Sequence, residues 1–184
     1  MTQDGTAIAR ALDQYSRADN MTDRMAALET LAQHDRPERA AVLDDFYRRY
    51  ADDPLIIDKW LALQAIIPEP ATLERVRALT GHPAFSMANP NRVRALIGAF
   101  AQANHTQFNR LDGSGYDFVA DVLLELDPKN PQVAARLLSA FKSWRALEAG
   151  RRARAEATLR RVAAAQNLSR DVADIVRRAL GESG

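Results

Sequence analysis

The sequence predicts an all-α fold, a superhelical and solenoid-like stack of about ten antiparallel helices. Apolar residues recur at the three- and four-residue spacing of a helix face, and no run alternates apolar and polar residues for long enough to indicate a strand. Helix starts are clearly marked at Asp53-Pro54, Asn89-Pro90 and Asn130-Pro131, where a capping residue precedes proline at the first helical position. The predicted connections are mostly short, so successive helices should pack as antiparallel neighbours.

The N-terminal part of the chain contains four of the predicted helices. The first covers residues 6–17, the second begins at a Thr22 cap, the third follows Pro37, and the fourth begins at Asp53. Each of them carries a set of apolar residues, and those of the first two helices should face inward. These residues are Ile8, Leu12 and Tyr15; Met25, Leu28 and Leu31; Val42, Leu43, Phe46, Tyr47 and Tyr50; and Leu55, Ile56, Trp60, Leu61 and Leu63.

The C-terminal part contains the other six predicted helices. A short helix at 70–79 ends before Gly81, which is a plausible C-terminal cap. The helix that begins at Asn130-Pro131 should carry Val133, Leu137, Phe141 and Trp144 along one face. The remaining predicted helices are the one that begins at Asn89-Pro90 and those at 116–126, 151–166 and 169–180.

Length and composition indicate one domain, residues 1–184, and exclude several classes of protein. The 184 residues are enough for a single core, and the formal charge of +1 gives no global reason to expect nucleic acid or an anionic membrane as a partner. No apolar run approaches the roughly 20 residues that span a bilayer, and the N-terminal residues do not resemble a secretory signal. Cysteine is absent, which excludes disulfides and thiolate catalysis. We therefore expect a cytoplasmic protein.

No catalytic or metal-binding motif is visible in the chain. His34, His82 and His105 are scattered, and none belongs to the H-E-x-x-H pattern that places two imidazoles on one helix face to hold zinc. No serine lies in a G-x-S-x-G turn. We therefore expect neither a metal site nor a self-contained active site in this chain.

Two other features have a structural and a functional interpretation. The segment Asp112-Gly113-Ser114-Gly115-Tyr116 could cradle a phosphate before a helix, but no strand precedes it, and a turn with Ser114 and Asp117 as an acidic capping box explains its residues better. The helix at 151–166 could contact nucleic acid or an acidic partner through its arginines. A solvated face explains these arginines better, because the segment has no aromatic residues that could stack on bases. The basic residues of this helix are Arg151, Arg152, Arg154, Arg160 and Arg161.

The segment NPNRVRALIGAF, residues 89–100, raises a question about its two arginines. Val93, Leu96, Ile97 and Phe100 form one apolar stripe, and the opposite side has only small residues, which predicts close packing there too. Arg92 and Arg94 lie at the two edges of the stripe, and Arg136 lies beside a similar stripe in the helix that begins at Asn130. A buried guanidinium needs an acidic partner, water or a ligand, so both structural ion pairs and a ligand-facing cavity remain open.

A family resemblance narrows the choice. The segments NPNRVRALIGAF (89–100), DGSGYDF (112–118) and NPQVAARL (130–137), in this order and spacing, closely resemble the C-terminal helical domain of bacterial aminopeptidase N, the zinc-dependent alanyl aminopeptidases. NMTDRMAAL (20–28) and DKWLALQA (58–65) also resemble that domain. The resemblance implies a superhelical domain that covers the active site of a larger enzyme and encloses a cavity for peptides.

The resemblance also implies a division of labour and three site residues. An upstream catalytic domain of the same polypeptide would carry the H-E-x-x-H zinc motif and the G-x-M-E-N motif, and this chain contains neither. Gln132 would lie near the pocket for the first side chain of the substrate, and Arg94 and Arg136 would face the interior cavity near bound peptide. No role carries over to Arg92. A free-standing helical-repeat module for protein interaction is the alternative that the residues leave open.

Overall fold

The computed structural model describes residues 3–182, and every regular element in this range is helical, which confirms the all-α prediction. The N-terminal part forms α1 (Gln3–Arg17), α2 (Met21–Ala32), α3 (Pro37–Tyr50), α4 (Pro54–Ile66) and α5 (Thr72–Thr80). The middle forms α6 (Pro90–Val93), the π-helix η1 (Arg94–Gly98), α7 (Ala99–Ala103), α8 (His105–Phe108) and α9 (Ser114–Leu126). The C-terminal part forms α10 (Pro131–Leu138), the 3₁₀ turns η2 (Ser139–Phe141) and η3 (Trp144–Ala146), α11 (Ala149–Ala163) and α12 (Arg170–Leu180).

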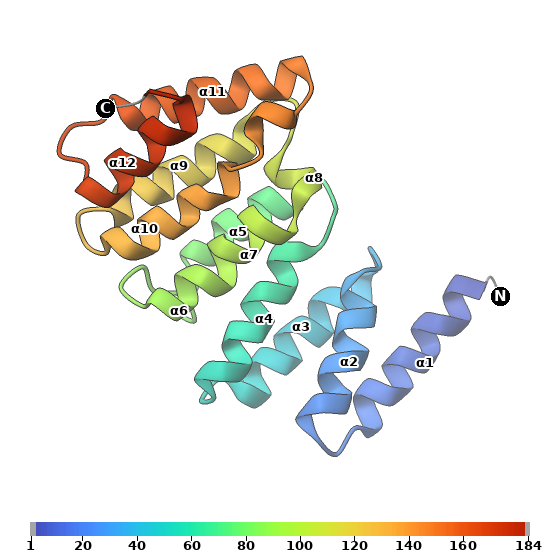
Figure 1. Ribbon diagram of the computed structural model, residues 1–184. Helices are drawn as coiled ribbons and strands as arrows, with labels where there is room; N and C mark the ends of the chain where they lie inside the picture. The colour runs from blue at the N-terminus through green and yellow to red at the C-terminus, as the bar shows by residue number, and fades with distance from the viewer. Residues whose placement is uncertain (1–2, 183–184) are drawn as a thin grey trace.

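The helices form an elongated stack. In Figure 1 the chain runs from α1 at one end, through α4 and α7 in the middle, to α11 and α12 at the other end. Neighbours in sequence pack together at the N-terminal end, where α1 contacts α2, α2 contacts α3, and α3 contacts α4. The order changes at the C-terminal end, because α11 packs on α9 and α12 packs on both α10 and α11. The predicted packing of sequential helices therefore fails at one step, because α11 packs on α9 instead of on α10.

Helix α4 lies at the centre of the stack. It contacts α2, α3, α5, α6, η1 and α7, and it is apolar around most of its circumference, as expected of a helix enclosed by others. The indole Nε1 of Trp60 donates a hydrogen bond of 2.8 Å to the carbonyl of Leu43, which ties α4 to α3. Buried Asn104, at the end of α7, donates to the carbonyls of Ala65 and Ile67 at 3.0 and 2.9 Å and so satisfies the C-terminal end of α4.

The three predicted helix starts are confirmed, and one predicted cap is wrong. The side-chain oxygens of Asp53, Asn89 and Asn130 each accept backbone N–H bonds from the first turn of the helix that follows. The second helix is capped by Asn20 instead of Thr22, because the Asn20 side chain accepts from the N–H of Asp23 at 2.9 Å. Asparagine and threonine both cap helices, so the sequence allowed either Asn20 or Thr22 as the cap.

The loop before α9 is a turn, although the predicted capping box is wrong. A carboxylate oxygen of Asp112 accepts from the Ser114 hydroxyl at 2.6 Å and from its backbone N–H at 3.0 Å. Asp117 instead accepts from the Thr158 hydroxyl at 2.9 Å and so joins α9 to α11. Gly113 has φ of 80°, a left-handed conformation that favours glycine. The residues of the DGSGY segment thus position α9.

The helix that begins at Asn130 ends earlier than predicted. Helix α10 stops at Leu138, and Phe141 and Trp144 lie in the 3₁₀ turns η2 and η3 instead of on the same helix. Both side chains are nonetheless buried, so the apolar pattern predicted burial correctly and the element incorrectly. The turns redirect the chain into α11, and the bend that they make borders a cavity described below.

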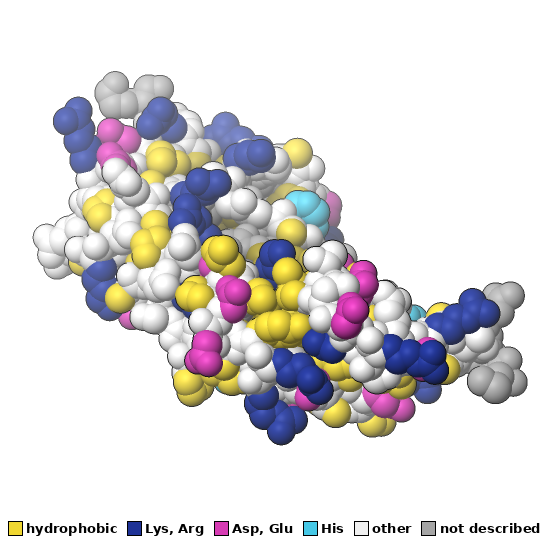
Figure 2. Space-filling view, turned by 90° about the horizontal axis from the view of Figure 1, so that it is seen from below, with side chains coloured by type: hydrophobic (Ala, Val, Ile, Leu, Met, Phe, Trp, Pro, Cys, Tyr) yellow, Lys and Arg dark blue, Asp and Glu magenta, His cyan; other side chains and the backbone are white. Residues whose placement is uncertain are grey.

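The surface shows no separation of charge on the face drawn in Figure 2. Basic and acidic side chains lie interspersed there, and hydrophobic side chains are visible near the middle of the molecule. None of the helices within the described part of the chain has the length and apolar character that a membrane crossing requires.

Candidate functional site

The site is built around the segment that contains Arg94. Asn89 caps α6 through bonds to the N–H groups of Asn91 and Arg92, and Pro90 occupies the first helical position. The predicted apolar stripe is completely buried, because Val93, Leu96, Ile97 and Phe100 are each 0% exposed. The segment is not one α-helix, however. Residues 94–98 form a π-helix, in which i→i+5 hydrogen bonds widen the turn, and such turns are frequent at functional sites.

Arg92 has a structural role. Its guanidinium forms an ion pair with the Asp58 carboxylate and donates to the carbonyl of Pro54 at 2.7 Å. Both charged side chains are largely buried, with 12% and 21% of their surface exposed. These two contacts tie α6 to the N-terminal half of α4. Of the two possibilities for these arginines, Arg92 thus takes the structural ion pair.

Arg94 is exposed and has no acidic partner among residues 3–182. Its guanidinium turns back over the start of its own helix, where it donates to the Asn91 side-chain oxygen and, at 3.3 Å, to the carbonyl of Pro90. These bonds orient the side chain while its charge stays unbalanced. An ion pair therefore accounts for Arg92 and leaves Arg94 available to a ligand.

Arg94 and Arg136 line the same groove. The groove has a volume of about 290 Å³ and lies between the η1–α7 segment and α10. No acidic residue lines it, and Arg136 makes no side-chain hydrogen bond or ion pair within the described part of the chain. The other residues that line it are Gly98, Ala99, Gln102, Ala103, Val133 and Leu137. Two guanidinium groups over a wall of small and apolar residues suit a carboxylate or a row of carbonyl oxygens.

The predicted close packing at the small-residue side is found in part: α10 contacts η1, and the groove opens between them. A β-carbon added at Gly98 would meet only its own helix, with Arg94 and Val93 atoms at 3.9 Å and nothing from a neighbouring element within 4 Å. The small residues allow the contact with α10 and also keep the wall of the groove low. A sequence pattern does not reveal the groove, since close packing and a groove both require small side chains.

Gln132 lies outside the groove-lining set. It is exposed at the start of α10, four residues before Arg136 and therefore on the same side of that helix. The structure thus brings two of the three predicted site residues together and places the third one turn away.

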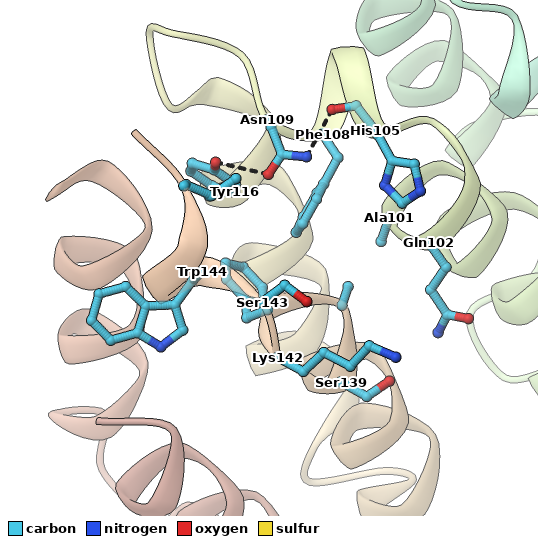
Figure 3. A pocket seen from close by; sticks show the side chains of 13 residues that line it. Ala101, Gln102, His105, Phe108, Asn109, Tyr116, Ser139, Lys142, Ser143 and Trp144 are labelled. Atoms are coloured by element: carbon cyan, nitrogen blue, oxygen red, sulfur yellow. Dashed lines mark hydrogen bonds between the residues drawn. The ribbon is translucent and has the colours of Figure 1, made fainter. Parts of the chain in front are cut away.

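A larger cavity adjoins the groove and was not predicted. It has a volume of about 630 Å³, and Gln102 lines both spaces. In Figure 3 the aromatic side chains of Phe108, Tyr116 and Trp144 lie on one side, and Gln102 and Lys142 extend toward the other. The sequence predicts only that Phe141 and Trp144 share one face of a helix. Both side chains are buried, and they also line this cavity where the chain bends at η2 and η3.

Burial controls the ionisation of Tyr116, which lies in this wall. Burial raises the pKa of Tyr116 to about 12, and nearby Arg151 opposes the rise only in part. The hydroxyl therefore remains neutral near pH 7 and donates to the side-chain oxygen of Asn109 at 2.9 Å. The Asn109 amide donates in turn to the carbonyl of His105 at 2.8 Å, so the wall of the cavity is connected by hydrogen bonds.

The other candidate features have structural explanations. Residues 3–182 contain no group of three or more His, Cys, Asp or Glu side chains that could hold a metal ion. Most arginines of the basic helix are paired: Arg151 with Glu148, Arg160 with Glu156 and Glu182, and Arg161 with Asp117 and Asp121. These contacts favour the solvated and ion-paired interpretation of that helix over nucleic-acid binding.

Comparisons with known proteins agree with this architecture. A family model described as "Domain of unknown function (DUF3458_C) ARM repeats" matches residues 1–181. The chain is 40% identical to aminopeptidase N of Haemophilus influenzae over 166 residues, which is 90% of this chain and 19% of that protein. It is also 40% identical to aminopeptidase N of Caulobacter vibrioides over 174 residues, 95% of this chain and 20% of that protein.

A solved structure is similar over nearly the whole chain. It is the crystal structure of Legionella pneumophila aminopeptidase A in complex with aspartic acid, with a TM-score of 0.89 and 32% identity over 96% of this chain and 21% of that one. The chain thus spans about a fifth of the length of the relatives that it matches, and the matched part is their C-terminal region. The fully helical stack and the family model together show that the chain belongs to the ARM-repeat family found as the C-terminal region of bacterial aminopeptidase N.

Proposed function

We propose that the chain is the C-terminal domain, residues 1–184, of a larger zinc-dependent alanyl aminopeptidase, in which it covers the active site and lines the cavity for peptides. The observation that carries this proposal is the groove in which Arg94 and Arg136 converge without an acidic residue. The relatives that the chain matches are aminopeptidases as whole proteins, which supports the reaction class.

In this proposal the two arginines bind the part of a peptide beyond the scissile bond. A guanidinium offers several N–H donors in a fixed plane, so it can hold a terminal carboxylate or backbone carbonyls of an extended peptide. Gln132 lies on the same side of α10, and we propose that its amide contributes to the pocket for the first side chain of the substrate. Both functions are binding functions, and neither moves a proton or an electron pair.

The chemistry belongs to the upstream catalytic domain. Zinc bound there would polarise the scissile carbonyl and activate water, and this chain would supply no ligand to it. The isolated chain is therefore expected to hydrolyse no peptide. The proposal also places the complete enzyme in the cytoplasm, which cell fractionation would test.

One surface suits contact with the rest of such an enzyme. A second groove, of about 610 Å³, lies between α2 and α4 and is lined in part by Met21, Met25, Leu63 and Ile66. Ile66 is 36% exposed and so adds apolar surface beside this groove. The groove is also lined by Glu29 and Lys59, and flexible methionine side chains in such a groove adapt to a packing partner. We propose that the upstream domain covers it.

The test uses the complete enzyme encoded by the longer reading frame. In Arg94→Ala or Arg136→Ala, kcat/KM for tetrapeptides should fall about tenfold, because each change removes a charge-assisted contact worth about 1–2 kcal/mol. Hydrolysis of a single-residue chromogenic substrate should change less than about twofold, since such a substrate does not extend past the scissile bond.

Arg152→Ala is the matched control. Arg152 is an exposed arginine of α11 outside the groove, so its loss should affect neither substrate. Equal losses on both substrates in the Arg94 and Arg136 variants would contradict the binding role. A genuine translation start at Met1 would contradict the larger enzyme and would favour the free-standing interaction module.

A further inference from the structure

The cavity next to the Arg94–Arg136 groove has a wall that is already ordered. The rings of Phe108 and Tyr116 meet edge to face with centroids 5.1 Å apart, and Phe141 contacts Phe108 at 5.2 Å. The Nε1 of Trp144 donates to the carbonyl of Ala179 at 3.1 Å, which fixes its indole against α12. These contacts hold the aromatic surface in place, so a ligand would not have to order it on binding.

The rim of the cavity is polar and positively charged. Gln102, His105, Ser139 and Lys142 are exposed around the opening, and Figure 3 shows the Lys142 ammonium and the Gln102 amide extending on the same side. The Lys142 side chain forms no hydrogen bond or ion pair with any residue that the structure describes. A lysine at this position has its full charge available to a ligand.

The charge of the two adjoining spaces is entirely of one sign. Neither the cavity nor the groove is lined by an aspartate or a glutamate, whereas Arg94, Arg136 and Lys142 contribute three cations. Gln102 lines both, so a chain that enters the groove can continue into the cavity without crossing an acidic side chain. Such a field favours a ligand with negative charge at the end that reaches the cavity.

We propose that this cavity binds the C-terminal residue of a peptide, with an apolar or aromatic side chain against the Phe108–Trp144 wall and the terminal carboxylate at Lys142. The volume of about 630 Å³ lies within the range of small-ligand sites, which runs from roughly 300 to 1,000 Å³. An apolar wall with one cation at its rim matches a residue that has both an apolar side chain and a carboxylate. Gln102 and Ser139 supply donors and acceptors for the peptide backbone.

This proposal rests on the proposed function, because it takes peptides as the ligand. It adds that the domain recognises the far end of a peptide as well as covering the site where the near end is cut. Substrates long enough to reach Lys142 would bind better as free acids than as amides, and those with an apolar C-terminal residue would bind best.

The test measures binding to the 184-residue chain by nuclear magnetic resonance. The probes are N-acetyl-Ala-Ala-Phe with a free carboxylate and the same peptide as its C-terminal amide. The chain has two tryptophans, so its spectrum contains a built-in reference. Trp144 lines the cavity, so the signal of its indole N–H, bonded to Ala179, should shift on titration. The signal of Trp60, bonded to Leu43 between α3 and α4, should not.

Two variants assign the carboxylate contact. We expect the free acid to bind about five- to tenfold more tightly than the amide, as a charge-assisted contact predicts. Lys142→Gln should abolish this difference. Lys129→Gln makes the same change of charge on an exposed lysine that pairs with Glu125 and lines neither space, and it should preserve the difference.

The outcomes separate this proposal from the one on which it rests. An unchanged Trp144 signal, or equal affinities of acid and amide in the wild-type chain, would overturn it. If the probe shifts the backbone amide of Gly98 in the groove and leaves Trp144 unchanged, the peptide binds at Arg94 and Arg136 only, so this inference fails while the proposed function stands. If Lys142→Gln keeps the preference for the acid, Lys142 is not the carboxylate site and the assignment is wrong.

Discussion

At the scale of single residues, two glycines in helical segments have opposite surroundings. Gly98 lies in the wall of the groove, and an added β-carbon would contact no neighbouring element. Gly115 lies in the first turn of α9, and an added β-carbon would overlap the backbone oxygens of Gln107 and Phe108. The close approach of α8 to α9 therefore requires glycine at 115, whereas the fold places no such requirement on 98.

This difference predicts opposite effects of the same substitution. Gly98→Ala should raise the free energy of unfolding by about 0.5–1 kcal/mol, because alanine loses less backbone entropy than glycine in a helix. Gly115→Ala should lower it by at least about 2 kcal/mol, because the overlap is with backbone atoms that cannot move aside alone. Urea unfolding of both variants, followed by far-UV circular dichroism, measures the two changes. Destabilisation by Gly98→Ala would show that the groove is narrower than described.

The residues of the site also show what a sequence can predict. Arg94 and Arg136 do lie together in a groove, but periodicity only placed them at the edges of apolar stripes, and a resemblance was needed to distinguish them from Arg92. Lys142 was missed altogether. Its neighbours Phe141 and Trp144 form a core-like pattern, and nothing in that pattern shows that the chain bends between them and opens a cavity.

At the scale of elements, the longer helices were predictable, whereas short or irregular elements and some boundaries were not. Helix starts with a cap and a proline were predicted correctly, because the capping residue and the proline are adjacent in sequence and act on the first turn of the same helix. The π-helix at 94–98 and the end of α10 at Leu138 were not predicted, since tertiary packing decides them. The apolar residues of these segments are buried as expected, although the geometry of the backbone differs.

A cluster of charges connects the N-terminal helices to one another. Glu69, in the turn before α5, pairs with Arg39 of α3 at 2.9 Å and with Arg75 of α5. Burial alone would raise the pKa of Glu69, but hydrogen bonds from Arg75 and Arg39 outweigh it and hold this pKa below its ordinary value. The stability that Glu69 contributes is therefore present above its unfolded pKa and is lost as the pH falls through the lower, folded-state pKa.

We expect Glu69→Gln to cost about 1–3 kcal/mol of unfolding free energy at pH 7, because two guanidinium groups lose their charged partner. The variant should also lose less stability than the wild type between neutral pH and about pH 3, since the titrating group is gone. Chemical unfolding at several pH values measures both effects.

Glu125→Gln, in an exposed pair with Lys129, is the control and should change stability by less than about 0.5 kcal/mol. Parallel pH curves for wild type and Glu69→Gln would contradict the expectation.

At the scale of the whole molecule, the stack predicts that stability varies along its length. Helix α1 lies at one end and packs mainly on α2, whereas α4 is enclosed by six other elements. Stacked helices open most easily where they have fewest neighbours. Helix α12 also lies near an end, but it packs on both α10 and α11 and so should be intermediate.

Hydrogen exchange of the backbone amides tests this order. Amides of α1 should exchange faster than those of α4 by about two orders of magnitude after correction for intrinsic rates, because local opening of one terminal helix costs less than global unfolding. Amides of α12 should lie between them. Equal protection in α1 and α4 would show that the stack opens only as a whole.

The π-helix has a consequence for how insertions and deletions would affect this protein. Because i→i+5 bonds enclose one residue more per turn than α-helical bonds, the segment 90–103 accommodates one residue more than a regular α-helix between the same two ends. Deleting one residue within 95–97 would let regular turns replace the wide turn, and the two flanking halves would keep their faces. Asn89 would still cap the start, Phe100 would stay in the core, and Arg94, which precedes the deletion, would keep its place at the groove. A single-codon deletion would thus be tolerated here, whereas in the regular helix α4 it would rotate the residues that follow by about 100°.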